Sequence, residues 1–209
     1  MPLEICIDSP ESAYEALFGE ADRVEICSEL SVGGLTPTIG LFDVVHRQLR
    51  GFPMPYRAMI RPRSGDFVYS NREMEVMVTD IETLYKHGAR GFVFGCLKAD
   101  YTVDEEKCRR LLKAANGAPC TFHRAFDWTP DWRNAMQKIA SLGFDTILTS
   151  GQKPTVGEAF DTLREMAEFS VQCPVGGTAT HVEVMAGSGL EEYSLTKLLA
   201  DTTIRWFHR

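Results

Sequence analysis

Short apolar runs alternate with longer amphipathic segments along the whole chain. Eight short runs, rich in Val, Ile, Phe or Cys, have the length and composition of β-strands. They cover residues 3–8, 23–28, 56–61, 91–97, 120–125, 146–150, 182–186 and 204–208. The segments between them have the apolar periodicity of helices. These cover residues 10–20, 40–50, 72–87, 104–115, 131–142, 156–169 and 191–199. The alternation predicts parallel strands joined by right-handed helical crossovers.

The number of these units selects the fold. Eight strand–helix units in 209 residues predict a single-domain, closed (β/α)8 TIM barrel, near the lower size limit of about 200 residues for that fold. A doubly wound open sheet is the alternative, but it more often has a G-x-G-x-x-G turn after its first strand, which Cys6 to Pro10 do not match. The chain stops at Arg209 without a complete final helix. We expect a partner subunit to cover the apolar surface left there, so a homo-oligomer.

Composition and charge narrow the classes of function. The net charge of −7 argues against a nucleic-acid partner, which requires a basic face. No apolar run approaches the about 18 residues of a membrane span, so we expect no membrane partner. The first residues lack the basic region of a signal peptide, which favours a cytoplasmic location. In that reducing compartment the six cysteines, none in a C-x-x-C pair, are expected to stay thiols.

Side-chain alternation places polar residues inside the predicted barrel. The residues between the outward apolar ones of each strand point to the barrel axis. By this parity the inward set is Glu4, Cys6, Asp8, Glu25, Cys27, Met59, Arg61, Thr121, His123, Glu183 and Met185. Parity directs Ile204, Trp206 and His208 outward, although a bulge at the strand end would re-aim His208. A purely structural barrel interior is mostly Val, Ile and Leu, and each unpaired buried charge costs several kcal/mol. The inward charges therefore indicate a functional site.

Arg61 is the first catalytic candidate. It ends a strand, where TIM barrels hold anionic substrates, and an arginine suits such ligands. Arg63 and Asp66 on the following loop are candidates for substrate binding. The alternative for Arg61 is an internal ion pair with Glu25 or Glu4.

Acid–base chemistry has its own candidates. His123 could work with Asp127 at the end of the fifth strand, and a hydrogen-bonded core histidine is the alternative. Glu25 and Glu183 are candidate general bases.

Two C-terminal residues complete the substrate-binding candidates. Ser188 lies in a Gly-Ser-Gly turn after the seventh strand, a place where many barrels bind phosphate through backbone N–H groups. A plain tight turn is the alternative. His208 is the other candidate, at the end of the eighth strand.

Several long motifs resemble those of the CutC family, which is named for copper homeostasis. They are EICIDS at 4–9, DRVEICS at 22–28, GGLTP at 33–37, MIRPRSGDF at 59–67, GFVFG at 91–95, TFHRAFD at 121–127 and LTSG at 148–151. MAGSG at 185–189 and the pair Phe207-His208 match the family less closely, and the stretch 170–181 is longer than its usual connection. The resemblance implies a TIM barrel, a cytoplasmic location and Cu(I) binding, but no particular reaction.

Cys6 and Cys27 are the candidate copper ligands under this resemblance. Both follow a Glu-Ile pair, on strands expected to be neighbours about 4.8 Å apart. Thiolates favour Cu(I), whereas a buried cysteine also packs as a small hydrophobe. Two hypotheses therefore remain. One is a copper-binding protein that uses both thiols. The other is a metal-independent enzyme for a small anionic or phosphorylated substrate.

Overall fold

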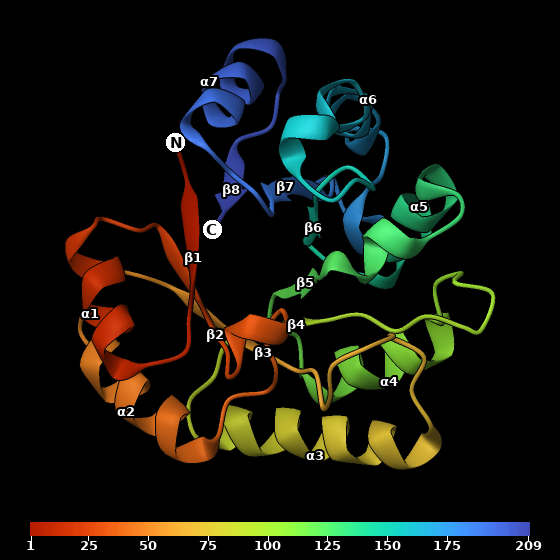
Figure 1. Cartoon of the computed structure of the whole chain (residues 1–209). Helices are drawn as coiled ribbons and strands as arrows, with labels where there is room; N and C mark the ends of the chain where they lie inside the picture. The colour runs from red at the N-terminus through yellow and green to blue at the C-terminus, as the bar shows by residue number, and fades with distance from the viewer.

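Eight parallel strands close into a barrel in the computed structural model, which describes residues 1–209 (Figure 1). Each strand pairs with its sequence neighbours, and β8 pairs with β1. The strands are β1 Leu3–Ile7, β2 Arg23–Ile26, β3 Tyr56–Met59, β4 Phe92–Phe94, β5 Cys120–Phe122, β6 Thr146–Thr149, β7 Glu183–Gly187 and β8 Trp206–His208. This topology confirms the predicted (β/α)8 fold class.

Seven α-helices form a ring outside the strands (Figure 1). They are α1 Pro10–Phe18, α2 Ile39–Leu49, α3 Asn71–Lys86, α4 Glu105–Ala114, α5 Trp132–Leu142, α6 Phe160–Ser170 and α7 Glu192–Asp201. No helix follows β8, and none of the seven is long and apolar enough to span a membrane.

Helix α3 shows why these segments become helical. Ser70 and Glu73 form a capping box at its start, which satisfies backbone N–H groups that have no partner within the helix. Its buried residues are spaced three or four apart and so share one face, Met74, Met77, Ile81 and Leu84. Gly88 follows the helix with φ +109°, a conformation that favours glycine.

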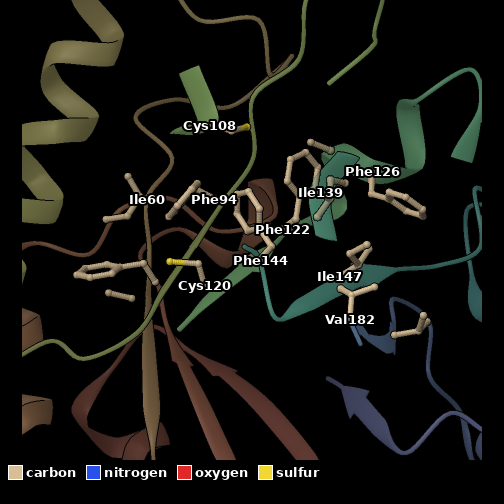
Figure 2. Packing of buried hydrophobic residues seen from close by; sticks show 14 of the residues in the cluster. Ile60, Phe94, Cys108, Cys120, Phe122, Phe126, Ile139, Phe144, Ile147 and Val182 are labelled. Atoms are coloured by element: carbon tan, nitrogen blue, oxygen red, sulfur yellow. The ribbon is translucent and has the colours of Figure 1, made fainter. Parts of the chain in front are cut away.

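The main hydrophobic core lies between the barrel and the helices, not inside the barrel. It contains 48 buried residues, whereas the interior cluster contains only Cys27, Met59 and Val93. Figure 2 shows part of the main core, with Phe94, Phe122 and Phe144 packed together. The rings of Phe94 and Phe122 each lie edge-on to that of Phe144, with ring centres 5.2 and 5.3 Å apart. Cys108 and Cys120 belong to this packing, which is a structural role (Figure 2).

Charged side chains and one neutral histidine occupy the space that this arrangement leaves inside the barrel. The buried set comprises Glu4, Arg23, Glu25, Arg57, Arg61 and His123. Near the amino ends of the strands, Arg57 donates to both carboxylate oxygens of Asp145, at 2.7 and 3.0 Å. The interior charges closer to the carboxyl ends surround a cavity.

The parity expected for the last strand is wrong. The guanidinium of Arg23 lies 4.1 Å from the centre of the Trp206 ring, and His208 reaches Glu25, so both β8 side chains point inward. The parity count began at Ile204, but β8 begins at Trp206 and Ile204 belongs to the preceding connection. Counting from an apolar residue outside the strand therefore assigned Trp206 and His208 to the wrong face.

Candidate functional site

A cavity of about 470 Å³ opens among the carboxyl ends of the strands. Polar and sulfur-bearing side chains reach it from six strands or the loops that follow them. They are Cys6, Glu25, Cys27, Met59, Arg61, His123, Arg124, Ser188, His208 and Arg209. This is the end of a TIM barrel at which enzymes of the fold bind their ligands.

Two glutamates, an arginine and a histidine form a cluster inside the barrel where β8, β1 and β2 adjoin. Of the four, Glu25 and His208 line the cavity. Glu4, fully buried, forms an ion pair with Arg23. Glu25 accepts a hydrogen bond from His208 Nε2 at 2.8 Å. Burial alone would lower the pKa of His208, but the hydrogen bond to Glu25 and its negative charge raise that pKa above its usual value.

This cluster leaves carboxylate oxygens without partners. Oε1 of Glu4 and Oε1 of Glu25 are buried and accept no hydrogen bond. One ligand atom from each of Glu4, Glu25 and His208 lies within 4.8 Å of the other two, so these residues could also hold a metal ion. Oxygen and imidazole donors of this kind suit divalent ions better than Cu(I).

The two candidate copper ligands lie directly beside this cluster. Cys6 pairs with Glu25 across the β1–β2 register, and Cys27 follows Glu25 by two residues on the same side of the chain. Both line the cavity; Cys6 is partly exposed and Cys27 is fully buried. The loop after β2 packs close to Cys27. A Cβ atom added at Gly34 would lie 3.1 Å from the Cys27 Sγ.

Burial and nearby carboxylates keep both thiols protonated. Burial, and next the charge of Glu25, raise the pKa of Cys6 to about 12. Burial also raises the pKa of Cys27 well above its usual value, with added contributions from Glu25 and from Cys6 itself. Cys6 and Cys27 thus share one electrostatic environment, set by burial and by Glu25.

Arg61 lies directly after β3, the strand next to β2, and forms no ion pair. Its two terminal nitrogens donate to the backbone carbonyls of Val32 at 2.9 Å, Gly34 at 3.1 Å and Gly65 at 3.2 Å. The alternative of an internal pair with Glu25 or Glu4 is therefore wrong, because those carboxylates are occupied by His208 and Arg23.

His123 lies near Arg61, directly after β5. Its Nδ1 accepts a hydrogen bond from the Ala125 N–H at 3.3 Å, and its buried Nε2 has no partner. Burial, and next the positive charge of Arg61, lower the pKa of His123 to about 3, so the ring is neutral near pH 7. A neutral ring that accepts at Nδ1 carries its proton on Nε2.

Asp127 is not the partner of His123 that the sequence suggested. It lies in a short 3-10 helix, Arg124–Trp128, and forms a 2.9 Å ion pair with Arg124. It also accepts hydrogen bonds from Thr149 and from the Ser150 backbone. These bonds hold the loop after β6 and turn the carboxylate away from the cavity, so the expected pair does not form.

Three other candidates lie outside the cavity. Arg63 forms ion pairs with Glu73 and Asp66 and donates to nearby backbone carbonyls, so Arg63 and Asp66 shape the loop between β3 and α3. Glu183 is the exposed first residue of β7. The first residue of a parallel strand lies at the opposite end of the barrel from the cavity, so placing Glu183 in the site is wrong.

Ser188 does line the cavity, in the loop after β7. Its hydroxyl donates to the Pro154 carbonyl at 3.1 Å, and its backbone is left-handed at φ +80°. Its predicted role in phosphate binding stays a prediction.

Sequence reasoning missed Arg124, which lines the cavity, and Arg23, which lies buried inside the barrel beyond the cavity lining. The signal was available, because Arg23 precedes Glu25 by two positions and therefore has the same parity. Because Arg23 is the first residue of the predicted strand, it was not assigned to the barrel interior, where it pairs with Glu4.

A closed parallel barrel with a polar cavity at the carboxyl ends of its strands defines a TIM-barrel protein with a ligand site in the usual place for this fold. Comparisons with known proteins identify its family. The sequence model of the CutC family matches residues 1–209. The chain belongs to the CutC family.

The relatives cover nearly the whole chain. The chain is 39% identical over 206 residues to the copper homeostasis protein cutC homolog of Caenorhabditis elegans, covering 99% of this chain and 78% of that protein. It is also 39% identical to the Homo sapiens homolog of that name, covering 99% of this chain and 71% of that protein. The solved structure of CutC from Streptococcus agalactiae has a TM-score of 0.89 at 27% identity, covering 100% of this chain and 97% of that chain.

Proposed function

We propose that this protein binds Cu(I) between Cys6 and Cys27 and takes part in copper homeostasis in the cytoplasm. Relatives named copper homeostasis proteins support the general role in copper homeostasis. The observation that carries the proposal is the position of two free thiols on neighbouring strands, beside carboxylates in a shared cavity.

The electrostatics of this part of the cavity favour a cation. Burial, and next the charge of Glu25, raise the pKa of both thiols, so protons occupy the sulfurs in the free protein. A bound cation stabilises the thiolates that the carboxylates disfavour, and it releases protons as it binds. Soft thiolate ligands select Cu(I) over hard divalent ions.

The set of Glu4, Glu25 and His208 is a weaker candidate for copper. Glu4 is already paired with Arg23, and Glu25 with His208. A metal on this set would displace the proton of His208 and compete with a buried guanidinium. Neither thiol takes part in these two ion pairs, so no cation has to be displaced from the sulfur atoms.

A Cu(I) titration tests the proposal. The reduced protein is titrated without oxygen against a competing Cu(I) chelator, beside a Cys6→Ser, Cys27→Ser variant. A Cys108→Ala, Cys120→Ala variant is the matched control, because those thiols lie in the core outside the cavity. We expect one Cu(I) per chain in the wild type and control, and its loss in the Ser variant. Equal affinity in all three proteins would overturn the proposal.

We also propose that the protein forms a homo-oligomer. Large apolar side chains are exposed on α1 and α7, namely Tyr14, Phe18, Tyr193 and Leu199. Figure 1 shows these two helices on either side of β8 and β1. Such exposed apolar side chains are typical of a surface that a second subunit covers.

A further inference from the structure

Two N–H groups in the cavity wall lack acceptors. Among buried side-chain nitrogens, only Nε of Arg61 and Nε2 of His123 have no hydrogen-bond partner. The two residues come from different strands, after β3 and after β5, and both line the cavity. A buried donor without an acceptor is costly, so a pair of them in one cavity points to a missing ligand.

The chain itself fixes which atoms donate. The bond from Ala125 to Nδ1 leaves the only proton of the neutral His123 ring on Nε2. Three backbone carbonyls hold the guanidinium of Arg61 and leave its Nε–H free. Neither donor needs to reorganise before it binds an acceptor, which favours affinity.

Arg61 also brings a charge that nothing in the chain balances. It is 7% exposed and takes part in no ion pair. The buried carboxylates of Glu4 and Glu25 are engaged by Arg23 and His208. An unpaired buried cation costs several kcal/mol, and an anion in the cavity would offset that cost.

One aromatic ring connects the two donors. The centre of the Phe67 ring lies 4.8 Å from that of His123 and 5.1 Å from Cζ of Arg61. Phe67 lies on the loop between β3 and α3, is half-buried and lines the cavity. Because neither orphan nitrogen is open to solvent, a ligand would reach them by displacing this ring.

We propose that Arg61 and His123 bind the oxyanion group of a small organic acid or phosphate ester, at a subsite separate from the two thiols. The anion accepts hydrogen bonds from Nε of Arg61 and Nε2 of His123, and the guanidinium balances its charge. Carboxylate and phosphate present the same acceptor chemistry to these donors, so the test includes both. The subsite stands on its own observations, independent of the copper proposal.

Nuclear magnetic resonance of the histidine rings gives a direct readout. The ¹⁵N-labelled protein at pH 7 is titrated with inorganic phosphate and, separately, with oxalate, against sodium chloride at equal ionic strength. We expect a saturable shift of the His123 Nε2–H signal with at least one of the two anions, while His46 and His87, outside the cavity, stay unchanged. The responding anion distinguishes phosphate from carboxylate. If neither anion shifts His123 more than chloride does, the subsite does not exist.

Variants separate this site from general charge effects. His123→Phe removes the donor but keeps an aromatic ring against Phe67, and Arg61→Gln removes the charge. Arg109→Gln is the control, because Arg109 forms an exposed ion pair on α4. By calorimetry we expect anion affinity to fall at least tenfold in the first two variants and to stay unchanged in the control. Unchanged affinity in His123→Phe would overturn the proposal.

Two further proteins keep the outcome clear. Arg61→Lys keeps the positive charge and replaces Arg61→Gln if that variant does not fold. The Cys6→Ser, Cys27→Ser variant should bind the anion as the wild type does. Copper binding and anion binding can therefore fail separately.

Discussion

Replacing Arg23 with methionine should destabilise the protein strongly. Glu4 is fully buried and its Oε2 relies on Arg23. Its Oε1 accepts no hydrogen bond and lies 3.7 Å from His208 Nε2. Removing one member of a buried pair leaves an uncompensated charge, which costs about 3–5 kcal/mol. Arg23 also packs over the Trp206 ring, so the loss includes that contact. In a chain of this size each kcal/mol of lost stability lowers the Tm by about 2–4 °C, so we expect the Tm to fall by roughly 6–20 °C.

Urea denaturation and thermal melts at pH 7 measure this loss. Arg133→Met is the matched control, because Arg133 pairs with Glu165 and both side chains are more than half exposed, at 53% and 54%. Such a surface pair contributes about 0–1 kcal/mol. The Glu4→Gln, Arg23→Met double variant should recover most of the loss, since no buried charge is then unpaired.

Equal, small losses in Arg23→Met and Arg133→Met would refute this reasoning. The interior charges would then be well hydrated, and the electrostatic arguments about the cavity would fail with them. A double variant that is as unstable as Arg23→Met would instead assign the loss to packing against Trp206.

Two further predictions concern the cavity, and a third concerns the exposed apolar surface of α1 and α7. The pKa of His123 is about 3 in the folded protein, against about 6.5 for a histidine in the unfolded chain. Because the unfolded chain therefore binds the extra proton first, the free energy of unfolding falls as the pH drops below 6.5. His123→Phe should reduce that fall in urea denaturation between pH 6.5 and 4.5, and an unchanged slope would contradict the assignment. Glu25→Gln should lower the pKa of Cys6 and speed its alkylation by iodoacetamide at pH 8.5, whereas the exposed Glu15→Gln should not, as peptide mass spectrometry can measure. Phe18→Lys with Tyr193→Lys should reduce the mass found by light scattering from an oligomer to a monomer; a wild-type monomer would disprove the oligomer.

Strand alternation predicted much of this site because charges interrupt apolar runs visibly. Cys6, Glu25 and Cys27 line the cavity, as the parity of the first two strands indicated. His208 escaped the same rule, since periodicity does not show at which residue a strand begins. The sequence also placed Glu183 inside without showing at which end of the barrel it would lie.

Side chains beyond the strand ends were harder to predict. Asp127 was expected to meet His123, but short-range bonds to Arg124 and Ser150 direct it elsewhere. No period in the sequence encodes such loop contacts. The same limit applies to Arg61, whose carbonyl partners come from two different loops.

The cavity has two chemically different walls. Two thiols, the Glu25 carboxylate and His208 line the wall formed by β1, β2 and β8, and this wall suits a cation. Arg61 and His123 line the wall after β3 and β5, and this wall suits an anion. A copper ion and a small oxyanion would thus occupy one cavity without competing for the same atoms.

The position of bound copper tests the central claim most directly. Crystals of the reduced protein, loaded with Cu(I) without oxygen, would be measured for anomalous diffraction at the copper absorption edge. The account predicts one peak between the sulfur atoms of Cys6 and Cys27. A peak on Glu4, Glu25 and His208, or no peak in the cavity, would contradict it.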